Sequence, residues 1–146
     1  MPHHKSIHVK LTNLRKHLVS LLQSSSELDA GGLSTSNTVM ERLGALSDIN
    51  PQANKANPLP DLLAQIQQTN TTLPEHCQHL VNSVAALADD LPWYQRPVTN
   101  NPSFMAGPVN APIIGPKGLE VRHDLIVGVT LMRPDLDYPD HQHEPE

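Results

Sequence analysis

Two histidines, His141 and His143, lie one residue apart near the end of the sequence. Alternate residues of a β-strand project to the same face, so the imidazole rings of both would point toward one position if this segment is extended. Neutral imidazole is the commonest side-chain ligand for metals in proteins. The spacing therefore predicts a metal site in residues 134–146, with His141 and His143 as ligands.

The alternative is an acidic tail that binds metal adventitiously. The thirteen residues 134–146 contain five carboxylate side chains and no lysine or arginine. A His-x-His pair is by itself a weak signal, so the choice between a built site and a tail depends on whether a strand leads into it.

Such a strand is predicted directly before the histidines. The apolar residues of the run 119–131 fall mainly at odd positions, namely Leu119, Val121, Leu125, Val127, Val129 and Leu131. This period of two predicts antiparallel β-structure from about residue 119 onward, as two strands that meet near His123 and Asp124. The odd positions are expected to face a core, and the even-numbered Glu120 and Arg122 to face away from it.

Helical spacing of leucines dominates the part of the chain before this run. It predicts a first helix over about residues 7–23, which the segment Asp29–Gly32 is expected to stop. A second helix is expected to begin at Thr38, whose side chain would form a capping box with Glu41. The pair Asn50-Pro51 is expected to end it.

Two further helices are predicted before the β-structure. One covers residues 60–69, and the other begins at a capping box of Thr72 and Glu75 and closes at Leu91. The segment 93–116 is rich in proline, asparagine and glycine, so it is expected to be a long connection with extended pieces.

Bulk properties exclude several classes of protein. A length of 146 residues suits one domain, and a net charge of −5 without a basic face argues against nucleic-acid binding. No apolar run approaches a membrane span, and the first ten residues lack the apolar region of a secretory signal. The single cysteine, Cys77, fits a reducing compartment. We therefore expect a cytoplasmic protein that binds neither nucleic acid nor membrane. Formation of a homodimer is left open.

The remaining chemistry-bearing residues are interpreted as structural. Cys77 lies on the apolar stripe of the fourth predicted helix, and His76 and His79 beside it are interpreted as the solvated edge of that helix. Four histidines of the first part of the chain are interpreted as surface residues: His3, His4, His8 and His17.

Three sequence segments together resemble the first metal-binding motif of a cupin. They are GPKGLE (115–120), DLIVGVTLMRP (124–134) and YPDHQHEPE (138–146). More narrowly, residues 93–146 resemble the cupin-type dimethylsulfoniopropionate lyases. Asp135 stands where the cupin pattern has a glycine, and Glu146 is one residue short of the position of the ligand glutamate.

The resemblance implies an α+β fold, with a helical region over residues 1–92 followed by a connection and an incomplete cupin barrel over residues 93–146. It implies a lyase that releases dimethyl sulfide and acrylate from dimethylsulfoniopropionate. His141 and His143 would be ligands of a divalent transition metal (Zn, Fe, Mn, Ni or Co), and Tyr138 would be the base or an assisting residue. It also implies an N-terminal fragment with impaired activity, because later site residues of the family are not among these 146.

Alternatives stay open for the function and for the aromatic residues. Trp93 and Tyr94 could offer a π face to the sulfonium of the substrate, or they could plug the space between helices and barrel. Tyr138 could instead be a packing residue at a barrel mouth. The alternative function is a non-catalytic cupin that binds a small molecule, or an interaction module.

Overall fold

The computed structural model describes residues 2–24, 29–50, 54–95 and 108–134. Its helices come first: α1 (Pro2–Ser24), α2 (Ala30–Leu43), α3 (Pro60–Thr69) and α4 (Glu75–Leu87), with short 3₁₀ turns at Asn70–Thr72 and Ala88–Asp90. The strands follow: β1 (Val109–Gly115), β2 (Glu120–Val121) and β3 (Val127–Leu131). Helices followed by strands confirm the predicted α+β class. No helix in these residues is long and apolar enough to cross a bilayer.

The described strands form an open sheet in the order β2-β1-β3. Strand β1 pairs antiparallel with β3, but it pairs parallel with β2. The prediction of antiparallel structure was therefore right for β3 and wrong for β2. Two antiparallel strands meeting near His123 were expected, whereas β1 lies between β2 and β3. The cupin barrel stays a prediction.

The central strand β1 lies in the segment that was expected to be a connection. Its sequence contains Pro112, which lacks the N–H of a ladder residue and usually argues against a central strand. The register between β1 and β3 shifts between Pro112 and Ile114, which is where a bulge lets the chain accommodate a proline. The same residue therefore explains both the missed strand and the irregular pairing.

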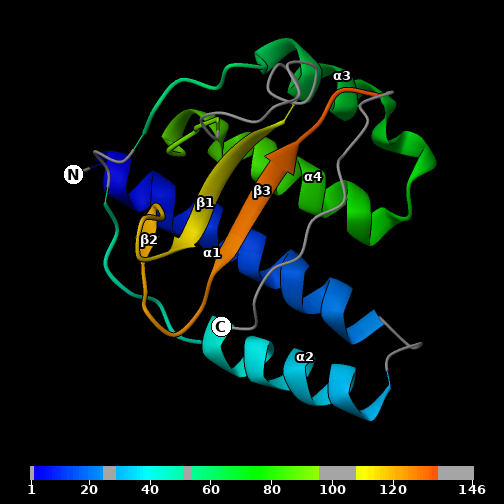
Figure 1. Cartoon of the computed structure of the whole chain (residues 1–146), viewed down its shortest axis with the longest axis vertical. Coiled ribbons are helices and arrows are strands. Elements are labelled where there is room, and N and C mark those ends of the chain that lie inside the picture. The colour runs from blue at the N-terminus through cyan, green and yellow to red at the C-terminus, as the bar shows by residue number, and fades with distance from the viewer. Residues whose placement is uncertain (1, 25–28, 51–53, 96–107, 135–146) are drawn as a thin grey trace, which may run out of the picture.

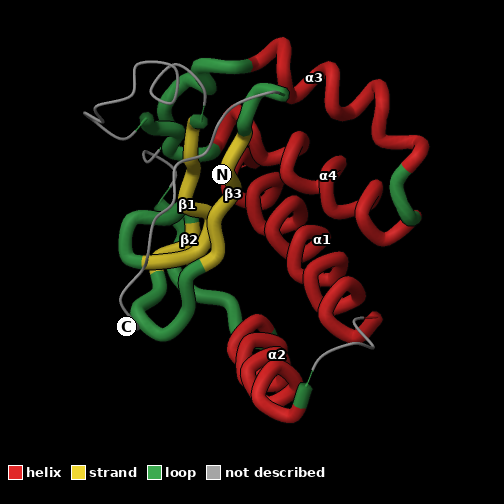
Figure 2. Tube along the Cα trace, turned by 45° about the vertical axis from the view of Figure 1, so that its right-hand side comes forward, coloured by secondary structure: helices red, strands yellow, loops and turns green. Residues whose placement is uncertain are grey.

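The core lies between one face of the sheet and the helices α1 and α4. Figure 1 shows β1 and β3 crossing in front of these helices, and Figure 2 shows the helices gathered on one side of the sheet. The most deeply buried apolar residues come from both layers: Ile7, Leu11, Leu14, Leu87, Leu91, Val109, Ala111, Ile113, Ile114 and Leu119. Burying a leucine or isoleucine stabilises a fold by about 1.5–3 kcal/mol, so this shared core fixes the sheet on the helices.

The boundaries of α2 differ from the prediction. The segment Asp29–Gly32 does not stop a helix but starts one, because the Asp29 side chain accepts a hydrogen bond from the Gly32 N–H at 2.7 Å. Thr38 lies inside α2, and its hydroxyl donates to the carbonyl of Ser34. The helix ends at Leu43 rather than at Asn50. Asp29 caps a glycine-rich first turn that by propensity alone resembles a loop.

The capping box predicted at the start of α4 is absent. Thr72 belongs to a 3₁₀ turn, and its hydroxyl donates to the Thr69 carbonyl. Helix α4 begins at Glu75 directly after Pro74, without a side-chain cap. At its other end, the last turn before Leu91 is 3₁₀ rather than α-helical.

Candidate functional site

The three residues predicted to carry the chemistry, Tyr138, His141 and His143, lie outside the described residues. Their roles as base and metal ligands therefore stay predictions. The strand β3 that was predicted to lead toward them is present. Among the residues that the structure describes, no group of three or more His, Cys, Asp or Glu side chains could hold a metal ion.

The two aromatic residues predicted to bind substrate occupy different environments. Trp93 is 2% exposed, and its ring N–H donates to the Ala88 carbonyl at 2.8 Å. Tyr94 is 42% exposed. Its N–H donates to the Asn110 carbonyl and its carbonyl accepts from the Asn110 N–H, both at 2.8 Å, so the Tyr94 backbone extends the sheet beside β1. Trp93 thus packs in the core, and the ring of Tyr94 is accessible.

Tyr94 belongs to a row of side chains on the helix-distal face of the sheet. Paired residues of neighbouring antiparallel strands share a face, and Asn110 pairs with Tyr94 on one side and Thr130 on the other. The Thr130 hydroxyl donates to the Asn110 side-chain carbonyl at 2.7 Å. The neighbours Val109 and Leu131 are buried on the opposite face. We define Tyr94, Asn110 and Thr130 as the outer row; β3, which carries Thr130, leads toward residue 134.

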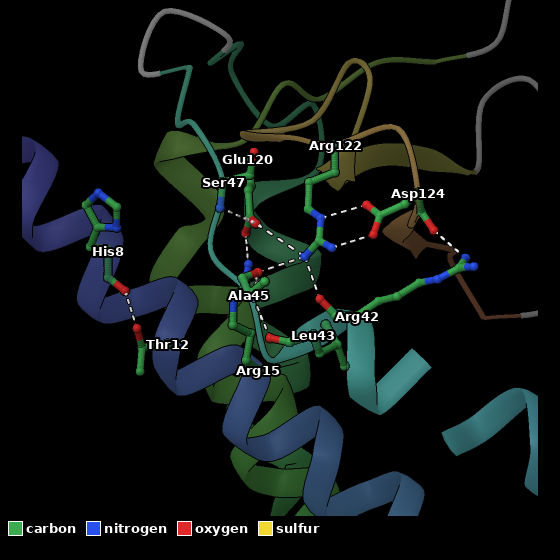
Figure 3. A network of polar contacts seen from close by, with 10 residues as sticks. All are labelled: His8, Thr12, Arg15, Arg42, Leu43, Ala45, Ser47, Glu120, Arg122 and Asp124. Atoms are coloured by element: carbon green, nitrogen blue, oxygen red, sulfur yellow. Dashed lines mark hydrogen bonds and ion pairs between the residues drawn. The ribbon is translucent and has the colours of Figure 1, made fainter. Parts of the chain in front are cut away.

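A buried polar network holds this sheet on the helices (Figure 3). Glu120, at the start of β2, is fully buried and forms an ion pair with Arg15 of α1. Its other carboxylate oxygen accepts from the Ser47 N–H at 3.1 Å. Glu120 and Arg122 were expected to face away from the core, and this expectation was wrong, since both are buried.

Two arginines of this network satisfy the carbonyl groups at the end of α2. Arg15 donates to the carbonyls of Leu43 and Ala45, and Arg122 donates to those of Arg42 and Ala45, at 2.5–2.8 Å. The last carbonyls of a helix lack intrahelical partners and carry partial negative charge. Guanidinium groups from α1 and from the residue after β2 supply both the donors and the opposite charge. We call this arrangement the arginine clamp.

Asp124 completes the arginine clamp from the loop before β3. Both its carboxylate oxygens accept from Arg122, at 2.8 and 2.6 Å, and its backbone carbonyl accepts from Arg42. The hydrogen bond from Arg122 lowers the pKa of Asp124 below its ordinary value, and the same bond raises the pKa of Arg122. The clamp therefore ties α1, the end of α2 and the entry to β3 together.

Sequence reasoning missed the arginine clamp because its signal is distributed along the chain. Arg15 and Glu120 are separated by 105 positions. The only local hint is that Arg15 falls beside Leu14 on the apolar side of an amphipathic helix, where a charge needs a partner.

Comparison with known proteins identifies the family. The family model described as dimethylsulfoniopropionate lyase matches residues 34–146. Because the match covers more than half of the chain, the chain belongs to the dimethylsulfoniopropionate lyase family. Searches of curated proteins and of solved structures give no match. The matched residues contain the strands and the His-x-His segment, whereas α1 precedes them.

Removing Arg15 is expected to destabilise the fold strongly. Arg15→Met removes the nearer of the two cations from the fully buried Glu120 carboxylate and leaves Arg122 at 3.9 Å, which should cost up to about 3–5 kcal/mol in the free energy of unfolding. The matched control is Lys16→Met, because Lys16 is the exposed neighbour on the same helix. Urea denaturation measures both variants. Equal midpoints for the two would show that the buried pair does not hold the fold.

The contribution of Asp124 is expected to depend on pH. A carboxyl whose pKa is lowered by folding stabilises the fold above its ordinary pKa, and this contribution is lost as the pH falls through the lowered value. Asp124→Asn should therefore lower the urea midpoint at neutral pH and match the parent in strong acid. Asp89→Asn, which changes an exposed carboxylate, is the control. A midpoint difference for Asp124→Asn that is the same at every pH would contradict the assignment.

Proposed function

We propose that the chain catalyses the elimination of dimethyl sulfide from dimethylsulfoniopropionate, with acrylate as the other product. Family membership over residues 34–146 is the observation that carries the proposal. A base removes a proton from the carbon next to the carboxylate, and that electron pair forms the C=C bond of acrylate. The C–S bond breaks, its electrons stay on sulfur, and the sulfonium leaves as neutral dimethyl sulfide.

Three residues are proposed to carry the reaction. Tyr138 takes the proton, and His141 and His143 hold a divalent transition metal, for which the two imidazoles are suitable ligands. When bound, the metal would draw charge from the substrate carboxylate and make the neighbouring proton more acidic. The same positive charge favours the ionised form of a nearby tyrosine, which is the form that can accept a proton.

The outer row of the sheet is proposed to contact the sulfonium. An aromatic ring attracts a cation that lies over its face, and a sulfonium is a cation of this kind. The 42% exposure of Tyr94 supports it as the ring that meets substrate, because a buried ring cannot. Trp93 is then proposed to anchor this segment, since its ring N–H is bonded to the Ala88 carbonyl at the end of the helical layer.

Metal binding by His141 and His143 alone is expected to be weak. Catalytic metal sites usually have about three protein ligands, and the sequence supplies the two histidines of this motif. We therefore propose that the rate of turnover rises with metal concentration until the site is saturated.

Replacing Tyr138 tests the proposed base. With saturating divalent metal, the chain should release dimethyl sulfide, measured by gas chromatography, and Tyr138→Phe should lower kcat by about 10²–10⁴ because general-base catalysis is lost. Metal content should stay unchanged in Tyr138→Phe and fall in His141→Ala and His143→Ala. Unchanged kcat in Tyr138→Phe would reject Tyr138 as the base, and binding of dimethylsulfoniopropionate without any turnover would favour the non-catalytic cupin.

Replacing Tyr94 tests the proposed sulfonium contact. Tyr94→Leu should raise KM for dimethylsulfoniopropionate by about two- to fivefold, which corresponds to an exposed cation–π contact of about 0.5–1 kcal/mol. Tyr94→Phe retains the ring and should keep the parent KM. Similar KM values for the leucine and phenylalanine variants would remove Tyr94 from the substrate site.

A further inference from the structure

Helices α1 and α4 are joined by histidine contacts at both ends of their interface. His17 of α1 stacks on His79 of α4, with ring centroids 5.0 Å apart and an angle of 14° between the ring planes. At the other end, the ring of His3 lies 3.4 Å from the carboxylate of Asp90, just after α4. Low residue numbers of α1 therefore face the high numbers of the α4 region, so the helices run antiparallel (Figure 2).

Protonation weakens the stack of His17 and His79. Two neutral imidazoles stack without repulsion, whereas two imidazolium rings at this separation repel each other. The charged groups around the pair are Lys16 on α1, which adds to the repulsion, and Glu75 on α4, whose carboxylate lies 3.3 Å from the His79 ring. A proton on His17 would therefore meet the charges of His79 and Lys16.

Burial and these two neighbours also act on His17 in the folded chain. Burial first, and then the charges of His79 and Lys16, lower the pKa of His17 below its ordinary value. A histidine whose pKa is lowered by folding stabilises the fold at pH values above its ordinary pKa. This stabilisation is lost as the pH falls through the lowered pKa of the folded state. The stack is therefore intact at neutral pH and opposed by acid.

An ion pair holds the other end of the interface. Asp90 is buried, and its carboxylate accepts from Lys10 at 2.8 Å in addition to its contact with His3. The Lys10–Asp90 ion pair does not involve His17 or His79. Acid therefore opposes the stack at the second half of α1, while this ion pair holds the first half in place.

The loosened end of α1 carries Arg15. This residue lies two positions before His17 and donates to Glu120 and to the carbonyls of Leu43 and Ala45, at and just after the end of α2. We propose that the His17–His79 stack is a proton-controlled latch. Its protonation releases the second half of α1 from α4, while the contacts of Asp90 retain the first half. This release loosens the Arg15 contacts of the arginine clamp. Because α1 precedes the residues matched by the family, the latch governs how this helix attaches to the family's part of the chain.

Hydrogen–deuterium exchange of the whole chain tests the latch. Exchange is measured from about pH 8 to about pH 5, a range that extends well below the ordinary pKa of histidine, and it is corrected for its intrinsic pH dependence. The expected result is a selective loss of protection in residues 13–24 and 43–47 on acidification, with residues 3–10 still protected. A uniform change along α1, or no change, would overturn the proposal.

Variants separate the stack from other histidines. His17→Gln and His79→Gln each remove one ring of the stack and should abolish the acid-induced loss of protection. His8→Gln changes an exposed histidine of α1 and should retain that loss. The His79 side chain is 50% exposed, so His79→Gln is expected to fold even if His17→Gln does not. Acid-induced loosening that persists in His79→Gln would overturn the proposal. None of these outcomes depends on lyase activity.

Discussion

The burial of Glu120 is the constraint on which the rest of the structure depends. A carboxylate without solvent contact costs several kcal/mol unless a cation and hydrogen-bond donors surround it. Arg15 from α1 and the Ser47 N–H supply them, while Arg122 lies 3.9 Å from the same carboxylate. Buried pairs of this kind add little net stability but penalise any arrangement that separates the partners. The network therefore specifies where the first helix, the end of α2 and the start of β2 must meet.

This meeting point determines which face of the sheet remains for chemistry. With α1 and α4 packed on one face, the outer row of Tyr94, Asn110 and Thr130 lies on the other. Strand β3 carries Thr130 and leads to the segment with the His-x-His motif. The helices thus act on the proposed site indirectly, by fixing the sheet from behind. A loss of the Arg15 contacts would therefore displace β2 first, and it would affect β3 through the pairing of β3 with β1.

Sequence patterns predicted the features that depend on local periodicity. These features are the leucine stripe of α1, the helix at 60–69 and the strand before the histidines. In each of them, apolar residues recur at the period of a helix or of a strand. The patterns failed where the structure depends on residues that are distant in the sequence. Glu120 is buried because it pairs with Arg15 of α1. Strand β1 forms despite Pro112 because a register shift accommodates the proline. For the site, the segment 138–143 was recognised as a motif. The different exposure of Trp93 and Tyr94 follows from tertiary packing, so the sequence around these two adjacent residues could not predict it.

The central functional claim is that this family member removes the proton next to the carboxylate while dimethyl sulfide departs. The most direct measurement uses substrate that is fully deuterated at the carbon next to the carboxylate. The products formed in the presence of a divalent metal are identified and quantified by NMR. Equal amounts of dimethyl sulfide and acrylate are expected. The acrylate should retain one deuterium on the carbon next to its carboxylate, and it should form more slowly than from unlabelled substrate. Dimethyl sulfide without acrylate, or substrate consumed without release of dimethyl sulfide, would contradict the claim.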